Sequence, residues 1–268
     1  MILNPVKAKV EESVKKGKWM STTLPSSENW KSVCYGAGKF VAVCSNSDVA
    51  AYSTDGITWT QATLPSNENW QSVCYGGGKF VAVAIGDAVA ISTDGITWTE
   101  FAVVDNGWIQ IVLPASASWR SVCYGAGKFV AVCNNHNIAA YSTDGVTWTE
   151  ITLPVSGYWQ SVCYSGVNFV VVDSNSLVYY SNNGTTWNRA NQMPYYGCRS
   201  VCDGNGLVAV ASSGVNVAYS DSGIVWTKAT LPVSANWTSV CYGGGKFVAL
   251  ASGSAVAAYL QDIIETWR

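Results

Sequence analysis

Short runs of apolar residues recur along this chain of 268 residues at a nearly constant interval, and turns rich in Gly, Asn, Asp and Ser separate them. Each interval holds four runs of strand length, which in the second interval cover about 70–75, 79–84, 88–92 and 96–100. Runs and turns of this kind are typical of antiparallel strands joined by hairpins. The pattern therefore predicts a tandem array of four-stranded β-units.

A motif, WxSVCY, opens each interval and identifies the repeat. It occurs around Trp30, Trp70, Trp119, Trp159 and Trp237, and a divergent copy, CRSVCD, begins at Cys198. A second motif, of the form SxDGxxW, closes the interval and recurs about every forty residues. One interval is longer because of a ten-residue insertion, 101–110. Six copies of one unit in a single chain predict a closed repeat architecture.

The second run of each interval, such as FVAV at 80–83, is apolar at every position rather than at alternate positions. A strand with that pattern is buried on both faces. In a β-propeller each blade lies between two others, so both of its faces are buried. The sequence thus predicts an all-β fold, a six-bladed β-propeller of four-stranded antiparallel blades.

The two ends of the chain suggest how the ring closes. The segment 18–24 is similar to the outer strands of the internal copies, so we expect it to complete the last blade and to remove an exposed edge. This gives a single propeller domain over 18–268, preceded by an extension over 1–17. In that extension Asn4 and Pro5 are typical of a helix start and Gly17 of a helix end. Because so short a helix is only marginally stable by itself, we expect it to dock on another part of the protein or on a partner.

The SxDGxxW motif resembles the Asp-box of the sialidase-like (BNR) β-propellers, although these copies lack the residue that the family usually has between Asp and Gly. The resemblance implies a structural role in the hairpin between third and fourth strands, on the side away from the active or binding face. The residues concerned are Asp55, Asp94, Asp144, Asn183 and Asp221. An Asp or Asn there can accept hydrogen bonds from its own hairpin. The tandem repeats are also loosely similar to those of tail-associated proteins of bacteria and phages.

Charge is sparse in this chain. Lys and Arg number 15 against 17 Asp and Glu, the net charge is near −2, and only 12% of residues are charged. This excludes a nucleic-acid binder that works through phosphate contacts. No apolar run approaches the ~18 to 20 residues of a membrane span, and the N-terminus lacks the apolar block of a secretory signal. We therefore expect no nucleic-acid partner, no membrane insertion, and a cytoplasmic or virion-associated protein.

Nine Cys residues suggest a metal site or disulfides, but six of them occupy the same position of the repeat, so the fold sets their spacing. Free Cys behaves as a small buried apolar side chain. The chain has no CxxC pair and no His-rich cluster, which argues against a zinc site. We expect no disulfide, no metal and no cofactor.

The sialidase resemblance does not bring the activity with it. Sialidases use a cluster of three Arg, a Tyr and Glu nucleophile pair, an Asp acid/base and an Arg-Ile-Pro segment. This chain has four Arg in total and no Arg-Ile-Pro. A glycosidase also needs two facing carboxyl groups, and no motif marks such a pair. We therefore expect a protein that is not an enzyme.

The residue that precedes SVC varies, whereas the motif around it does not. In each repeat this residue begins the innermost strand. The six residues together should therefore ring the channel mouth on the face opposite the SxDG hairpins. We call this set the collar; its members are Lys31, Gln71, Arg120, Gln160, Arg199 and Thr238. The collar is a candidate binding site, and the alternative interpretation is a channel mouth that is merely polar and hydrated.

The insertion is a further candidate, because the fold does not require it. Its apolar residues flank a central turn at Asp105 and Asn106, which predicts a hairpin. We expect this hairpin to stand above the collar, with Trp108 and Arg120 contributing contacts to one wall of a pocket.

Two other departures from the repeat join the candidate list. The divergent connection before the fifth copy places Tyr195 and Tyr196 on the expected binding face. His136, the single histidine, lies in a loop between second and third strands, where a solvated side chain is the default and a ligand contact the alternative.

Three classes of function remain. The first is a non-catalytic recognition module for a glycan or cell-surface partner, in a tail or adhesion assembly where many copies bring avidity. The second is a scaffold or assembly protein that docks through its N-terminal helix. The third, a sialidase-like glycoside hydrolase, is disfavoured by the shortage of Arg.

Overall fold

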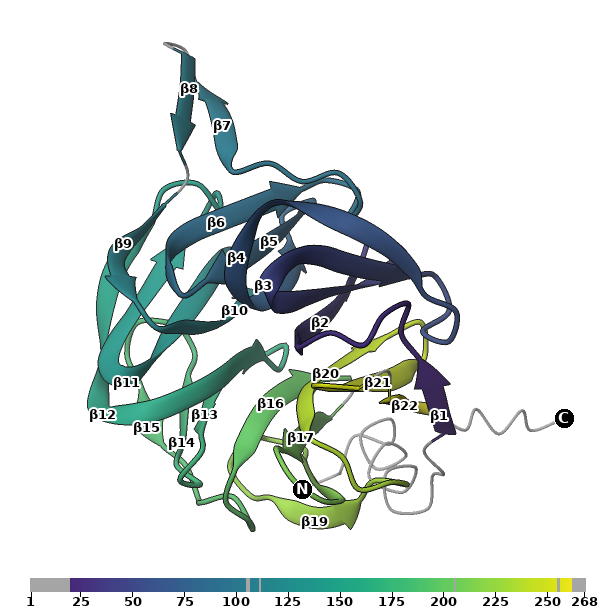
Figure 1. Ribbon diagram of the computed structural model, residues 1–268. Helices are drawn as coiled ribbons and strands as arrows, with labels where there is room; N and C mark the ends of the chain where they lie inside the picture. Colours follow the sequence, from purple (N-terminus) through teal and green to yellow (C-terminus); the bar gives the residue numbers. More distant parts are fainter. Residues whose placement is uncertain (1–19, 105–106, 111, 205, 255, 262–268) are drawn as a thin grey trace, which may run out of the picture.

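A computed structural model describes residues 20–104, 107–110, 112–204, 206–254 and 256–261. All regular elements within these ranges are β-strands, and they surround a central axis (Figure 1). The strands that carry the SVC motif are adjacent in turn around this axis, and the last is adjacent to the first. The chain is therefore a closed β-propeller.

Two of the sheets are six-stranded and carry two repeats each. The first has the order β2 (Trp30–Gly36), β3 (Lys39–Ser53), β4 (Thr60–Gly76), β5 (Lys79–Ala84), β6 (Gly86–Ser92) and β9 (Val112–Ala117). The second has the order β10 (Trp119–Gly125), β11 (Lys128–Ser142), β12 (Thr149–Tyr164), β13 (Phe169–Asp173), β14 (Val178–Ser181) and β15 (Asn188–Arg189).

The other two large sheets are four-stranded. One has the order β16 (Cys198–Asp203), β17 (Leu207–Ala211), β18 (Asn216–Ser220) and β19 (Thr227–Thr230). The other has the order β1 (Met20–Thr23), β22 (Val256–Gln261), β21 (Lys246–Ala251) and β20 (Trp237–Gly243). A separate two-stranded hairpin consists of β7 (Phe101–Val104) and β8 (Gly107–Gln110).

The prediction of six separate four-stranded blades is therefore wrong: the propeller has four blades. The reason lies in β4 and β12, which run without a break from the outer edge of one repeat to the inner position of the next. Strand β4 pairs with β3 through its first part and with β5 through its second. The hydrogen bonds thus join two repeats in one sheet. No helix occurs within the described ranges, and the segment 4–17, for which a helix is predicted, lies outside them.

The two ends of the propeller chain meet in one sheet. Strand β1 is antiparallel to β22, with Met20 opposite Tyr259 and Thr23 opposite Val256. Residues 18 and 19 of the expected closing strand lie outside the described residues. The pairing gives β22 a hydrogen-bonded neighbour on its outer side, which covers a strand edge.

The core lies between neighbouring repeats. The tryptophans that precede SVC are fully buried, and each packs with residues of the adjacent repeat; Trp30, for example, shares a cluster with Leu250 and Val248. Aromatic residues at such positions bury a large apolar area, and truncation of one of them to Ala costs about 3–5 kcal/mol. The repeated Trp is thus the main anchor between repeats.

Serine hydroxyls also join neighbouring inner strands. The Ser of each SVC motif accepts a hydrogen bond from the backbone N–H of the Val in the next repeat, and Ser239 of the last repeat accepts from Val33 of the first. The six distances are 2.8 to 3.1 Å. We call these residues the serine ring; its members are Ser32, Ser72, Ser121, Ser161, Ser200 and Ser239. Because an unpaired buried N–H costs about 1–3 kcal/mol, the ring stabilises the closed propeller.

At the opposite end of the inner strands, Tyr side chains pack on Gly. A Cβ built on Gly76 would lie 1.9 Å from Cγ of Tyr124, and one on Gly125 would lie 2.0 Å from Cγ of Tyr164. Only Gly permits this close approach. The contact recurs between neighbouring repeats except at one place, where Asp203 replaces Tyr and Ser165 replaces Gly.

The SxDG turns lie at this same end of the propeller. Asp94 accepts hydrogen bonds from the N–H groups of Ile96 and Thr97, both at 2.8 Å, and from the hydroxyl of Ser92. The hydrogen bonds from Thr97 and then Ile96 lower the pKa of Asp94 to about 2. Lys39, in the first hairpin of the preceding repeat, donates to the backbone carbonyl of Asp94 at 2.9 Å.

One of the expected turn residues, Asp221, stands at a different position of its turn from the other four. Asp55, Asp144 and Asn183 bond within their hairpins as Asp94 does. In the fifth copy, SDSG, the equivalent position is Ser222, whose hydroxyl accepts from the N–H of Ile224 at 3.2 Å. Asp221 stands one position earlier, so the shift by one residue gives it a different place in the turn.

Candidate functional site

The collar surrounds a cavity at the end of the axis opposite the SxDG turns. The cavity has a volume of about 160 Å³, and every residue that lines it is polar. The lining comprises the collar, the serine ring and three residues of neighbouring loops, Asn29, Asn236 and Ser252. The structure therefore brings together the residues that vary between repeats, although they are up to 207 positions apart (31 to 238) in the sequence.

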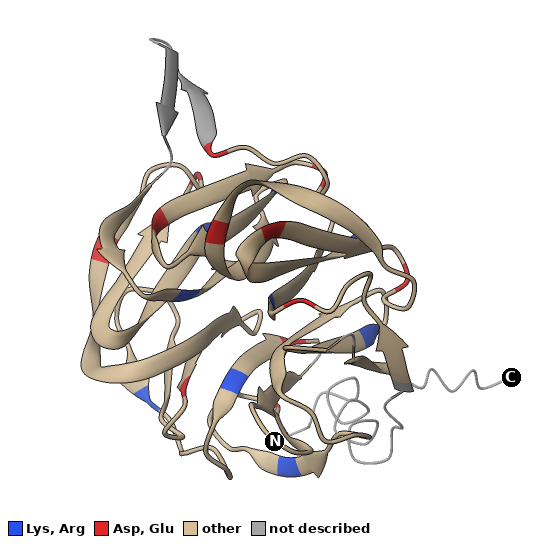
Figure 2. Cartoon of the chain, viewed as in Figure 1, with Lys and Arg blue, Asp and Glu red and all other residues tan. Residues whose placement is uncertain are grey.

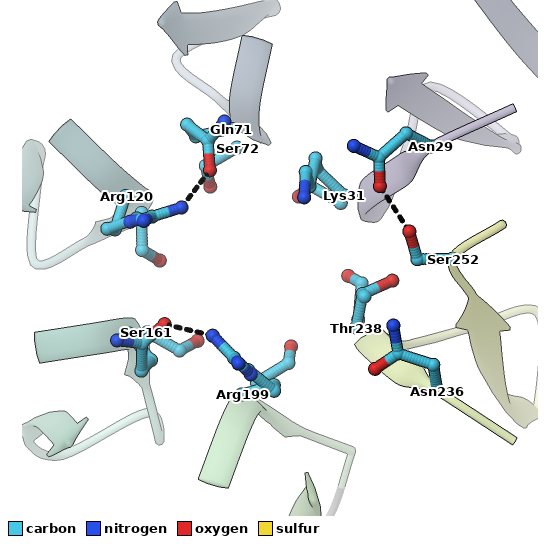
Figure 3. A pocket seen from close by; sticks show the side chains of 15 residues that line it. Asn29, Lys31, Gln71, Ser72, Arg120, Ser161, Arg199, Asn236, Thr238 and Ser252 are labelled. Atoms are coloured by element: carbon cyan, nitrogen blue, oxygen red, sulfur yellow. Dashed lines mark hydrogen bonds between the residues drawn. The ribbon is translucent and has the colours of Figure 1, made fainter. Parts of the chain in front are cut away.

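The cations of the collar alternate with neutral residues around the axis (Figure 3). Lys31, Arg120 and Arg199 belong to the first, third and fifth repeats, and Gln71, Gln160 and Thr238 to the second, fourth and sixth. Figure 2 shows the corresponding basic segments of β10 and β16 beside the central opening. No acidic residue is among those that line the cavity. The cations thus form a triangle with no carboxylate inside it.

Each arginine is held by the glutamine of the preceding repeat. Nη1 of Arg120 donates to Oε1 of Gln71 at 2.5 Å, and Nη1 of Arg199 donates to Oε1 of Gln160 at 3.1 Å. The amide of Gln71 in turn donates to Asn69, on both its backbone carbonyl and its side-chain oxygen. These contacts use one side of each guanidinium and leave other N–H groups for a ligand; Nε of Arg120 is buried without a partner among the described residues.

The third cation, Lys31, is held differently. The residue of the preceding repeat is Thr238, whose hydroxyl donates to the carbonyl of Trp30 at 2.8 Å. Among the described residues no side chain or carbonyl accepts a hydrogen bond from Lys31. Lys31 is therefore the least restrained charge of the collar.

Burial and mutual repulsion both act on these cations. Burial, and then the charges of Arg120 and Arg199, lower the pKa of Lys31. Burial and the charge of Arg199 likewise lower the pKa of Arg120. The two lowered pKa values mean that the charged forms of Lys31 and Arg120 are less favourable in the collar than in water. A bound anion would relieve this cost.

The serine ring forms the floor of the collar cavity. Its oxygens accept the Val N–H bonds, and within the described residues none of its hydroxyl hydrogens is donated to a protein atom. Because the serines line the cavity, their O–H groups can donate to an occupant. Sequence reasoning missed this ring, since an invariant Ser beside Val and Cys looks like part of the framework.

The insertion does not lie over the collar. Its hairpin prediction is confirmed, since Phe101 pairs with Gln110 and Val104 with Gly107. However, Figure 1 shows β7 and β8 projecting outward from the rim of the ring, away from the central opening. Asp105 and Asn106 lie outside the described residues, and for Trp108 only the backbone is described. Because the Trp108 side chain lies outside the described part of the structure, the expected pocket wall of Trp108 and Arg120 stays a prediction.

Of the paired tyrosines, only one is exposed. Tyr195 is buried, and its hydroxyl donates to the carbonyl of Ala209 at 2.6 Å. It packs beside Cys198, which takes the place of the repeated Trp. The Tyr195 side chain fills space that the smaller Cys leaves, and its contact with a ligand stays a prediction. Tyr196 is 79% exposed and His136 is also exposed, but neither lines the cavity.

A second cavity of about 170 Å³ lies at the other end of the axis. It is lined by the serine ring, by Val, Cys and Tyr of the SVCY motifs, and by Asp203. The nine cysteines are free, and burial raises the pKa of Cys44 and of Cys133 to about 11. In the described ranges no group of His, Cys, Asp and Glu is placed to hold a metal ion. Nor does any described segment form a helix long and apolar enough to cross a membrane.

One buried carboxyl lies outside both cavities. Asp173, at the end of β13, is fully buried; its Oδ1 accepts from the N–H of Leu177 at 2.6 Å, and burial raises its pKa. It occupies the position that Cys44 and Cys133 hold in other repeats. Since it does not reach the collar cavity, it is not a candidate acid for chemistry there.

Comparison with known proteins supports the fold. No protein-family profile and no curated sequence matches the chain. A catalytically inactive virginiamycin B lyase from Staphylococcus aureus with quinupristin is similar in structure, with a TM-score of 0.68 and 10% identity over 91% of this chain and 99% of that one. A gluconolactonase from Xanthomonas campestris has a TM-score of 0.68 and 10% identity over 93% and 92% of the two chains.

A further similar structure is a binding protein. YCF48 bound to D1 peptide has a TM-score of 0.64 and 14% identity, over 93% of this chain and 97% of that one. At such identities the likeness shows the β-propeller fold alone. Because these propellers include two enzymes and a peptide-bound protein, the fold does not decide between catalysis and binding.

Proposed function

We propose that this protein is a non-catalytic recognition module that binds an acidic group of a glycan or cell-surface partner in the collar cavity. The observation that carries the proposal is the triangle of Lys31, Arg120 and Arg199, which converges on one cavity with no acidic residue in its lining. An anion placed there gains charge-assisted hydrogen bonds. The same anion offsets the burial and the mutual repulsion that lower the pKa of Lys31 and of Arg120.

The chemistry of the lining favours binding over catalysis. General acid–base hydrolysis of a glycoside needs two carboxyl groups across a cleft, and the collar cavity is lined by amides, hydroxyls and cations. The wholly polar lining also favours a ligand rich in oxygen over an apolar peptide side chain. The resemblance of the SxDG hairpins to Asp-boxes supports a binding face at the opposite end, where the collar lies.

The position of the collar supports contact with a large partner. It lies at an end of the propeller axis, formed by the starts of the inner strands and by the loops with Asn29, Asn236 and Ser252. An acidic group at the end of a chain can enter such a mouth while the rest of the partner lies over the surrounding loops. Several copies of the protein in one assembly would then add avidity.

A glycan array that contains acidic and neutral glycans tests the proposal. We expect the full-length protein to bind acidic members, and we expect binding to fall as ionic strength rises, because salt screens the collar charges. The double variant Arg120→Gln and Arg199→Gln should abolish the signal. Arg189→Gln is the matched control, since Arg189 is exposed on β15 and does not line the cavity. Binding that is equal for neutral glycans, or unchanged in the double variant, would refute a collar site.

A further inference from the structure

We propose that the collar cavity is built for one tetrahedral oxyanion, a phosphate or sulfate group, whose three terminal oxygens face the three collar cations. This inference rests on the proposed function and names the class of acidic group. The bond to the rest of the ligand would point out of the mouth along the propeller axis. The shared chemistry is that of the –OPO₃²⁻ group, the –OSO₃⁻ group and the free inorganic ions.

The charge of the site favours a highly charged anion. Lys31, Arg120 and Arg199 place three positive charges around one cavity of about 160 Å³, whose lining contains no carboxylate. A monoanion such as a carboxylate offsets one of these charges and leaves two that repel each other. A dianion, such as a phosphate monoester or a free sulfate ion, offsets two, and in a partly buried site that difference is large because charges are poorly screened there.

The geometry favours a trigonal set of oxygens. The cations come from alternate repeats of a ring, so they approach the axis from three directions about equally spaced around it (Figure 3). Three terminal oxygens of a tetrahedral group also lie about equally spaced around the ester bond. A carboxylate is planar with two oxygens and is matched best by the two parallel N–H groups of a single Arg. Here each Arg already gives one Nη1 to a Gln of the preceding repeat.

The floor of the cavity supplies further donors. Six hydroxyls of the serine ring lie below the collar, and their hydrogens are not donated to any described protein atom. The buried Nε–H of Arg120 is a second kind of donor without a described acceptor. A tetrahedral oxyanion offers many lone pairs in all directions, whereas nothing in the lining except amide oxygens and hydroxyls accepts a bond. The excess of donors thus matches an acceptor-only ligand.

The size of the cavity sets the part of the ligand that enters. A volume of about 160 Å³ is small beside the ~300–1,000 Å³ of ordinary ligand pockets. This holds one oxyanion with a few waters but no oligosaccharide. The site is therefore suited to the terminal group of a larger ligand.

The test is a calorimetric titration of the full chain, at fixed ionic strength and pH 7.5, with sodium sulfate, sodium phosphate and sodium acetate. We expect sulfate and phosphate to bind at least tenfold more tightly than acetate. Lys31→Gln and Arg199→Gln should each weaken the binding of both dianions at least tenfold, and Arg189→Gln should leave it unchanged. Glucose 6-phosphate and glucose 6-sulfate, titrated in the same way, tell whether a phosphate or a sulfate ester is the tighter ligand.

The outcomes separate this inference from the proposed function. If acetate or glucuronate binds as tightly as sulfate and phosphate, and collar variants weaken it, the tetrahedral specificity is refuted and the acidic-group site stands. If no anion binds and acidic glycans are also not bound, both are refuted. If Arg199→Gln does not fold, Lys31→Gln decides the matter, because the Lys31 ammonium makes no hydrogen bond to a described protein atom.

Discussion

The two ends of the propeller axis obey different rules. At the end with the SxDG turns, residues that face the axis are nearly the same in every repeat, and Tyr side chains lie on Gly residues of the neighbouring repeat. At the collar end the equivalent positions differ from repeat to repeat, and cations stand together without an acidic partner in the lining. The first end is optimised for packing. The second accepts charge repulsion, which is the usual mark of a functional site.

The difference teaches how to separate framework from function inside a repeat protein. A position that is constant in all repeats is explained by contacts between repeats, as the serine hydroxyl bonds and the Tyr–Gly contacts show. A position that varies between repeats is a candidate functional position. This holds only if the variation does not compensate for a change in the packing of a neighbouring residue. Tyr195, for example, departs from the repeat but is buried beside Cys198, which stands where the other repeats have Trp.

The largest effect is expected where a departure from the repeat serves the core. Tyr195→Ala should lower the free energy of unfolding by about 3 kcal/mol or more, because it opens a cavity beside Cys198 and removes the hydrogen bond to Ala209. Tyr196→Ala, at the next position but exposed, should change it by less than about 0.5 kcal/mol. Denaturant unfolding of both variants measures this. Equal stability losses would show that Tyr195 is not a core residue.

The packing of the far end should be nearly as sensitive. Gly125→Ala should lower the free energy of unfolding by about 2–3 kcal/mol, because its Cβ would lie 2.0 Å from Tyr164. The matched control is Ser165→Ala, at the position where the chain already carries a Cβ, with an expected loss of about 1 kcal/mol from its hydroxyl bonds to Asn168. Anion binding at the collar should be the same in both variants. A tolerated Gly125→Ala would contradict the need for close Tyr–Gly contact.

A double-mutant cycle sharpens the same point. Asp203→Tyr alone would bring a ring onto the Cβ of Ser165, and Ser165→Gly alone would lose the hydroxyl bonds to Asn168. The double variant should restore the contact seen between the other repeats, so we expect a favourable coupling energy of about 1 kcal/mol. If the changes in the free energy of unfolding simply add, the residues at positions 165 and 203 are not coupled through packing.

The smallest effect concerns pH. The pKa of Asp94 and that of Asp55 are about 2 in the folded protein; for Asp94 hydrogen bonds dominate, and for Asp55 they outweigh burial, which acts the other way. A lowered folded pKa means that the contribution to stability is present above the ordinary value of 3.8 and is lost as the pH falls toward 2.

The triple variant Asp55→Asn, Asp94→Asn and Asp144→Asn should therefore show a smaller fall in melting temperature between pH 4 and pH 2 than the parent protein. Asn183 shows that the fourth repeat already uses an amide in this way. An equal fall in melting temperature between pH 4 and pH 2 in both proteins would mean that these carboxylates do not contribute to stability in acid.

Much of this arrangement could be predicted from the sequence, because it follows from periodic positions. Apolar runs such as that of β5 indicate strands buried on both faces, and the variable residue before SVC indicated the collar. The grouping of repeats into four sheets could not be predicted, since it depends on whether the backbone stays extended through segments such as 63–69 of β4. The direction of the β7–β8 hairpin could not be predicted either, because a hairpin pattern fixes which residues pair but not the angle between the hairpin and the ring. The burial of Tyr195 follows from the Trp-to-Cys change three positions later and could have been inferred from it.

The central claim is that the collar cations serve ligand binding and not the fold. The most direct test is the free energy of unfolding of Lys31→Gln, measured in anion-poor buffer and again with about 50 mM sodium sulfate. An ion that binds the folded state stabilises it appreciably only when its concentration is near or above its dissociation constant, so a weak ion needs a concentration of this order. We predict that without sulfate the variant is as stable as the parent protein or more so, because one of three repelling charges is removed. We also predict that sulfate stabilises the parent protein more than the variant. A variant that is less stable without sulfate by more than about 1 kcal/mol, with an unchanged response to the anion, would contradict the account.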